Sequence, residues 1–202
     1  MIGNRREDTD IDFTERTIDT RTFEPSAAET ELYEAVTEYV RGAYSQDSGQ
    51  KLVLMLLQKE VVSSPAALEQ TILKQLEEQN ELTHRDELET ILDKVDAIDT
   101  ITKQERLFDI VEEVRENVDM GRVIVFTQFR PTQRQVIEAL DKQGYTTHAF
   151  HGGHSSQEKE DIVDQFREEG GVLVSTDAMN EGRNLQFCNI MVNMDLPWNP
   201  MR

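Results

Sequence analysis

The polar segment at residues 175–186 carries the densest set of side chains in this sequence that could bind a ligand. It reads Ser-Thr-Asp-Ala-Met-Asn-Glu-Gly-Arg-Asn-Leu-Gln and directly follows an apolar run of strand length. Hydroxyls and free backbone amides after a buried strand can hold phosphates or sugar hydroxyls. The segment therefore predicts a phosphate or nucleotide contact, although any α/β protein places polar loops at such positions.

Two other sets of side chains nearby could do chemistry. His148, His151 and His154 recur at every third residue, a spacing that can supply metal ligands. They flank a strand end and a Gly-Gly turn with no cysteine nearby, so we interpret them as structural. Asp177 and Glu181 could form an acid–base pair, but no nucleophile or pocket signal accompanies them. We therefore expect no metal site and no catalytic residue.

An α/β sheet is needed to position these residues. From residue 121 onwards, apolar runs alternate with amphipathic helical patterns, and strands are predicted at residues 123–126, 146–150, 172–175 and 190–194. One helix is predicted from Pro131, and another follows the capping box Ser155-Ser-Gln-Glu158. Short connections and right-handed crossovers give a parallel sheet with helices on both faces.

The preceding residues are predicted to be mainly helical. Ser26-Ala-Ala-Glu29 is a capping box, and Pro65 suits the first turn of a helix that ends near residue 80. Lys51 begins a helix that is hydrophobic most of the way round and should be buried. Residues 83–119 predict two charged helices with a break at 99–102, and residues 14–23 a short strand. The first helix should bury one face, made of Leu32, Tyr33, Val36, Tyr39 and Val40.

The charge restricts the partners this chain can have. Its net charge is −19, from 40 acidic and 21 basic residues, with seven lysines and fourteen arginines. An acidic surface poor in lysine favours a protein that stays soluble at high salt. It argues against a general nucleic-acid binder, whose footprint is basic. Any contact with DNA would need a local patch.

The single cysteine and the apolar runs indicate the compartment. Cys188 lies in an apolar setting, which predicts a buried, inert thiol and excludes a disulfide framework. No apolar run approaches the roughly 20 residues of a membrane span, and residues 1–8 lack the apolar core of a signal peptide. We expect a cytoplasmic protein with no membrane partner.

Several short motifs follow one another in order. They are Val123-Ile-Val-Phe-Thr-Gln128, His151-Gly152, Val174-Ser-Thr-Asp177, Glu181-Gly-Arg-Asn-Leu-Gln186 and Asp195-Leu-Pro-Trp-Asn-Pro200. The set resembles motif IV, the next strand end, motif V and the approach to motif VI in the second RecA-like lobe of Snf2-type superfamily 2 helicases. The RapA-like prokaryotic branch is the most similar. With the acidic composition, a haloarchaeal origin is expected.

The resemblance implies a domain organisation and roles for individual residues. Residues 1–25 would belong to the inter-lobe junction, 26–118 to the helical region of lobe 2, and 119–202 to a RecA-like helicase C-terminal lobe truncated before motif VI. Nucleic-acid backbone contacts would come from Thr127, Gln128, Gly152, Ser175 and Thr176. The coupling of that contact to the ATP cleft would come from Glu181, Gly182, Arg183 and Asn184. Arg183 replaces an aliphatic residue of many relatives and matches the RapA-like branch.

Other family features are missing from this sequence. It has no Gly-x-x-x-x-Gly-Lys-Ser/Thr motif to cradle phosphates and no acidic Walker B strand, both of which belong to the first lobe, and it stops at Arg202 before the arginines of motif VI. The resemblance thus implies that ATP and Mg²⁺ bind in the intact parent protein and that this chain alone binds and hydrolyses no ATP. The implied partners are a first RecA-like lobe, in the same chain or in trans, double-stranded DNA, and RNA polymerase or another nucleoprotein.

A second function class stays open from the sequence. The chain could be a standalone, non-catalytic module that binds DNA or a protein and docks on a separate first lobe. The intact glycine and asparagine of motif V favour the motor lobe, because a binding module need not keep them. The acidic surface favours a protein partner.

Overall fold

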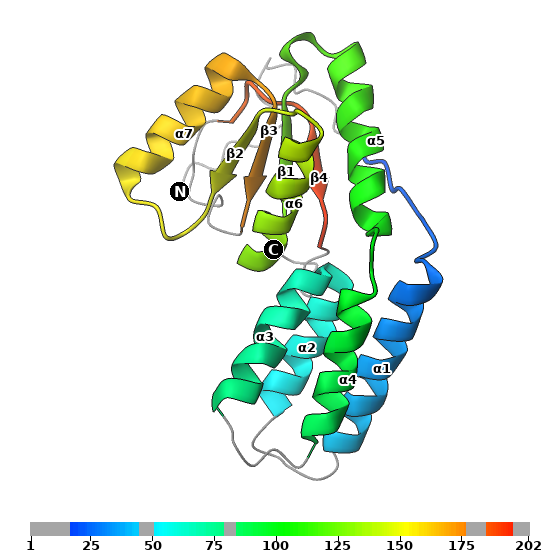
Figure 1. Cartoon of the computed structure of the whole chain (residues 1–202). Coiled ribbons are helices and arrows are strands. Elements are labelled where there is room, and N and C mark those ends of the chain that lie inside the picture. Colours follow the sequence, from blue (N-terminus) through cyan, green and yellow to red (C-terminus); the bar gives the residue numbers. More distant parts are fainter. Residues whose placement is uncertain (1–16, 45–50, 79–83, 177–184, 196–202) are drawn as a thin grey trace, which may run out of the picture.

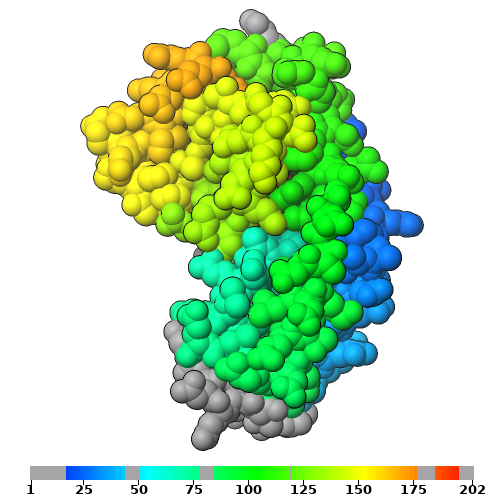
Figure 2. Space-filling view, in the orientation of Figure 1, coloured from blue at the N-terminus to red at the C-terminus, as the bar shows by residue number. Residues whose placement is uncertain are grey.

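The computed structural model describes residues 17–44, 51–78, 84–176 and 185–195. It has two parts, a bundle of four helices and a parallel sheet covered by three helices (Figure 1). The surface narrows where these parts meet, beside the teal helix α3 (Figure 2). The elements are α1 Ala27–Tyr44, α2 Lys51–Ser63, α3 Pro65–Glu78, α4 Arg85–Asp96, α5 Thr102–Asn117, the 3-10 turn η3 Asp119–Gly121, β1 Val123–Phe126, α6 Arg130–Lys142, β2 Thr147–Phe150, α7 Ser156–Glu169, β3 Val172–Ser175 and β4 Met191–Asn193.

The four strands form one sheet in the order β2-β3-β1-β4, and every neighbouring pair is parallel. All residues of β3 are buried, as expected for an inner strand of a parallel sheet that is covered on both faces. Val172 lies opposite Val123 of β1 on one side and opposite Thr147 of β2 on the other. The predicted α/β fold with four strands is confirmed.

Alternate residues of the strands face two different cores. Val123 and Val125 pack with apolar residues of α5 and α6, whereas Ile124 packs with Phe166 of α7. Since successive side chains of a strand point to opposite faces, α5 and α6 cover one face and α7 covers the other. Helices on both faces are therefore confirmed, and so is the capping box of Ser155 and Glu158 at the start of α7.

The bundle formed by α1 to α4 has its own core. Its first helix begins as predicted, because Glu29 N–H donates to Ser26 Oγ and Ser26 N–H donates to a Glu29 carboxylate oxygen. Four of the five predicted core residues of α1 are buried, but Tyr33 is 49% exposed. The prediction for Tyr33 was wrong. Helices α2 and α4 pack on α1 but cover a narrower face of it than the apolar residues of α1 occupy.

Helix α2 also departs from its prediction. Leu54 and Leu57 are buried, but Leu52 is 80% exposed, and Met55 and Val62 are also exposed. The expected burial of the whole helix was therefore wrong. An apolar run does not reveal which of its sides will meet a neighbour, and α2 packs chiefly on α1 and α3.

The buried apolar residues of helix α5 pack on the sheet, while its first turn contacts the bundle through Thr102 and Lys103. Leu107, Val111 and Val114 belong to the core that contains β1 and β3, whereas the bundle core ends with Val95 of α4. The division between the two cores thus lies between α4 and α5, and the boundary expected between residues 118 and 119 stays a prediction. The described part of the predicted N-terminal strand, residues 17–23, has no regular secondary structure.

Glu60 is a buried carboxyl group in the bundle. The side chain of Glu60 is buried on α2, and one oxygen accepts a 2.8 Å hydrogen bond from Thr71 Oγ1. The other oxygen has no partner among the described residues. Burial raises the pKa of Glu60 from 4.5 to about 7.

Between pH 4.5 and about pH 7, Glu60 of the folded chain keeps a proton that the unfolded chain has released. The free energy of unfolding therefore falls as pH rises through this range. Above that range, Glu60→Gln should increase the free energy of unfolding by about 2 kcal/mol. Below about pH 4.5 the gain should vanish. Urea denaturation at both ends of the range checks this, with the exposed Glu34→Gln as control. An equal effect of the two variants at every pH would contradict it.

Candidate functional site

The carboxyl ends of the strands bring most of the predicted site residues together. Thr127 follows β1, Gly152 follows β2, and Thr176 follows β3. Parallel strands end at the same edge of a sheet, where open α/β folds bind ligands. Backbone hydrogen bonds join these ends, from Thr127 N to Ser175 O at 3.0 Å and from Thr176 N to Phe150 O at 3.1 Å.

The predicted nucleic-acid contacts differ in how accessible their side chains are. Thr127 is 2% exposed and donates its hydroxyl to Asp195 Oδ2 at 2.6 Å. Ser175 is fully buried and donates to Thr176 O, and Thr176 is itself buried. Gln128 is half-buried and Gly152 is exposed. The hydroxyls of Thr127 and Ser175 thus hold the loops in place through internal hydrogen bonds.

The residues predicted to couple this edge to an ATP cleft are not among those the structure describes. Glu181, Gly182, Arg183 and Asn184 lie in the gap between residues 176 and 185, as does Asp177 of the weighed acid–base pair. Thr176 is the last described residue before them.

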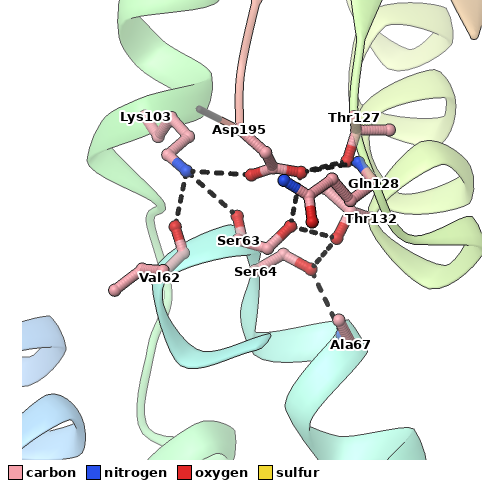
Figure 3. A network of polar contacts seen from close by, with 9 residues as sticks. All are labelled: Val62, Ser63, Ser64, Ala67, Lys103, Thr127, Gln128, Thr132 and Asp195. Atoms are coloured by element: carbon pink, nitrogen blue, oxygen red, sulfur yellow. Dashed lines mark hydrogen bonds and ion pairs between the residues drawn. The ribbon is translucent and has the colours of Figure 1, made fainter. Parts of the chain in front are cut away.

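Asp195, to which the sequence assigned no role, organises the edge beside β4 (Figure 3). Its side chain is 7% exposed. Oδ2 accepts hydrogen bonds from Thr127 Oγ1, from Gln128 N at 2.9 Å and from Ser63 Oγ at 2.9 Å. Oδ1 lies 3.4 Å from Lys103 Nζ. Both carboxylate oxygens are therefore bound by internal donors, which suits a positioning role.

Lys103 connects the same carboxylate to the bundle. Its side chain, 21% exposed, donates to Val62 O at 2.5 Å as well as facing Asp195. Val62 lies in the last turn of α2, where backbone carbonyls lack helical partners. The Lys103 ammonium group thus donates to a free carbonyl at the end of α2 and also balances the buried negative charge of Asp195.

A row of hydroxyls continues the network into α3 and α6. Ser63 Oγ donates to the carboxylate, so Thr132 Oγ1, 2.9 Å away, must donate to Ser63. Ser64 Oγ, 2.7 Å from Thr132 Oγ1, must then donate to Thr132, and it accepts from Ala67 N at 3.1 Å. A hydroxyl has one proton, so the direction of every bond follows from the acceptor-only carboxylate.

This network, which we call the Asp195 network, joins the bundle to the candidate site. It contains the α2–α3 junction, the first turns of α5 and α6, the loop after β1 and the end of β4 (Figure 3). Ser63 of the bundle is thus connected to Thr127 and Gln128 through one oxygen of the Asp195 carboxylate.

Gln133 fixes the other two strand ends. It is 2% exposed on α6, and its Nε2 donates to Phe150 O at 2.9 Å and to Val174 O at 2.7 Å. These carbonyls belong to the last two residues of β2 and β3, which lead into the loops that contain Gly152 and Thr176. One buried amide thus sets the separation of two loops. The signal that could have found Gln133 is its position one helical turn before the apolar residues Val136 and Ile137.

The three regularly spaced histidines do not converge. His148 is buried, and its Nε2 lies 3.0 Å from Gly170 O, at the other end of the sheet from the loop ends. His151 and His154 stack with ring centroids 3.6 Å apart. Within the described ranges, no three His, Cys, Asp or Glu side chains form a group that could hold a metal. Over the same ranges, no helix is both long and apolar enough to cross a membrane.

Comparison with known proteins identifies a family that contains this sheet. The family described as "Helicase conserved C-terminal domain" matches residues 102–202. An "Uncharacterized ATP-dependent helicase YqhH" from Bacillus subtilis is 34% identical over all 202 residues, which make up 36% of that protein. The chain thus spans about a third of this relative. The matched region begins at α5, where the sheet core also begins.

Two further similarities concern the branch and the fold. The "RNA polymerase-associated protein RapA" of Vibrio campbellii is 37% identical over 95 residues, covering 45% of this chain and 10% of RapA. The "SWI2/SNF2 ATPase C-terminal domain" of Sulfolobus solfataricus has a TM-score of 0.61 at 22% identity, covering 85% of this chain and 68% of that one. The RecA-like fold prediction is confirmed, whereas the predicted haloarchaeal origin stays a prediction.

Proposed function

The chain belongs to the family of helicase conserved C-terminal domains, and from this membership we propose that it is the second motor lobe of an ATP-dependent Snf2-type DNA translocase. The observation that carries the proposal is the carboxyl edge of the sheet. This edge lies in the family-matched region. It gathers Thr127 of the proposed motif IV, Gly152 of the next strand end and Ser175 of the proposed motif V. The sequence similarity to RapA supports the Snf2-type branch.

In this proposal the loop ends contact the phosphates of duplex DNA. Gly152 is exposed and Gln128 half-buried, so they are the accessible members of the set, whereas Thr127, Ser175 and Thr176 are buried and fix the shape of the edge through their hydrogen bonds. Backbone contacts to phosphates carry no base preference, which suits a protein that moves along its track. The chromosome is the proposed track, so the proposed location is the cytoplasm.

The proposed ATP cleft lies between this lobe and a first RecA-like lobe. Glu181, Gly182, Arg183 and Asn184 would face it, directly after the loop that follows β3. The first lobe would supply the P-loop and the Mg²⁺ site, in the same parent chain or in trans. The ATP-dependent relative YqhH supports the use of ATP by the parent. The name of RapA makes an RNA polymerase complex a candidate partner.

The affinity of the 202-residue chain for DNA distinguishes this proposal from a standalone binding module. A lobe that supplies half of a track should bind a short duplex weakly, with a Kd of about 10⁻⁴ M at about 0.15 M salt. Fluorescence anisotropy with labelled duplex DNA, and with single-stranded RNA of the same length as comparison, measures it. A duplex Kd below about 10⁻⁷ M would favour a standalone module. A preference for RNA would contradict a DNA translocase.

A further inference from the structure

A groove of about 350 Å³ lies between α3 of the bundle and α6 of the sheet part. We call it the α3–α6 groove. It is found where these two parts of the molecule meet and the surface narrows (Figure 2). One wall consists of the α3 residues Ala66, Glu69, Gln70 and Leu73. Residues at this spacing share one face of a helix, so a single face of α3 borders the groove.

The second wall is a matching face of α6. It consists of Pro131, Arg134, Gln135 and Glu138, whose spacing is the same as that of the α3 residues. None of these eight lining residues belongs to the candidate site at the carboxyl edge of the sheet. The groove is therefore a separate feature of the chain.

Hydrogen bonds between the two helices hold the walls in place. Ser64, directly before α3, and Thr132, in the first turn of α6, have their hydroxyl oxygens 2.7 Å apart. Further along both helices, Arg134 Nη2 donates to Gln70 Oε1 at 3.1 Å. Two direct bonds thus join the walls, so the folded chain itself sets the width of the groove.

The groove offers both apolar surface and hydrogen-bond acceptors. Leu73 is 43% exposed, and Ala66 and Pro131 are half-buried. Gln135 Oε1 is buried and has no hydrogen-bond partner among the described residues. A buried acceptor without a donor is costly, so a ligand that donates to this oxygen gains free energy by satisfying it.

The charge of the groove indicates a cation. Glu69 and Glu138 lie on opposite walls, and neither has a cationic group within 4.0 Å among the described residues. These two carboxylates and the guanidinium group of Arg134 give the lining a net charge of −1. One positive charge balances it, whereas a phosphate would meet repulsion from both carboxylates.

We propose that the α3–α6 groove binds an arginine side chain of a partner protein. A guanidinium group carries five donors in a planar fork, enough for Gln135 Oε1 and for carboxylates on two sides. Its aliphatic stem packs on Leu73 and its neighbours. The ammonium group of a lysine presents its three donors from a single point and does not match acceptors on two walls as well. This protein contact goes beyond the proposed DNA contact and does not depend on it.

Two short peptides that differ in one side chain test the proposal on the 202-residue chain. The first has one arginine among alanine and leucine residues, and the second has citrulline in its place, which keeps the shape but removes the charge. We expect the arginine peptide to shift the amide signals of α3 and α6 in nuclear magnetic resonance spectra, with a Kd on the order of 10⁻³ M. The citrulline peptide should bind at least roughly tenfold more weakly. Raising salt from about 0.05 to 0.5 M should weaken the arginine peptide only.

Substitutions in the groove and outside it complete the test. Glu138→Gln and Gln135→Leu each remove one acceptor and should weaken binding of the arginine peptide roughly fivefold. Glu138 is exposed, so its variant keeps the fold. Glu34→Gln removes the same charge from the exposed face of α1 and should change the affinity less than about twofold.

Equal binding of the two peptides, or equal effects of Glu138→Gln and Glu34→Gln, would overturn the proposal, because general attraction to an acidic surface would then explain the binding. Signal shifts confined to elements other than α3 and α6 would overturn it as well. The DNA titration described above is independent of these peptides. Failure of the groove therefore leaves the proposed function standing, and loss of duplex binding leaves the groove standing.

Discussion

Asp195→Ala should lower the free energy of unfolding by about 3 kcal/mol. The substitution leaves Thr127 Oγ1, Ser63 Oγ and Gln128 N without their acceptor in a site where the carboxylate is 7% exposed. It also leaves the partly buried ammonium of Lys103 with backbone carbonyls only. Removing one partner of a buried ion pair strands the other charge, and this is what makes the expected effect large.

Chemical denaturation of the variant and a matched control measures the effect. Asp109→Ala also removes an aspartate from an ion pair, with Arg106 on α5, but both side chains there are more than half exposed. An exposed pair contributes little, so this control should change stability by less than about 0.5 kcal/mol. Equal stability of the two variants would show that the Asp195 network does not hold the bundle to the sheet.

The loss should also be local. Hydrogen exchange of the Gln128 amide, which donates to Asp195, should accelerate in Asp195→Ala more than that of Val125 inside β1. The variant should weaken nucleic-acid binding only through this loop, because Gln128 N loses its acceptor. Asp195 is therefore a positioning residue for the proposed DNA contact.

Local patterns were sufficient to predict the sheet. The strand at Val172–Ser175 begins with three consecutive apolar residues after two glycines, a pattern typical of a strand buried on both faces. Ser155 and Glu158 lie three residues apart, and a capping box needs nothing beyond that local spacing. The grouping of Thr127, Gly152 and Ser175 at one edge then followed from the parallel order of the strands.

What failed depends on residues far apart in the chain. Leu52 was predicted to be buried because its neighbours are apolar, but only the packing of α1 and α3 decides which side of α2 is covered. The Asp195 network joins Ser63 to a residue 132 positions away. No periodicity in the sequence predicts such a pairing. Separation along the chain also hides the hydrogen bond from the Thr127 hydroxyl to Asp195, while the predicted nucleic-acid contact of Thr127 stays a prediction.

The second large effect concerns ATP turnover. The sequence contains no P-loop, and the described sheet edge offers loops but no Walker motif. We therefore expect this chain alone to hydrolyse ATP at the background rate, with or without DNA. Joined to a first RecA-like lobe and to the arginines of motif VI, the same chain should support hydrolysis several orders of magnitude faster, because positioning and charge stabilisation provide most of phosphoryl-transfer catalysis.

Duplex-dependent ATP hydrolysis by the joined protein is the most direct test of the motor-lobe assignment. We expect the rate of ATP hydrolysis to rise when duplex DNA is added. In Asp195→Ala, half-maximal stimulation should require a higher DNA concentration. The 202-residue chain measured in parallel should stay at background. Hydrolysis by the chain alone, or turnover in the joined protein that ignores DNA, would contradict the assignment.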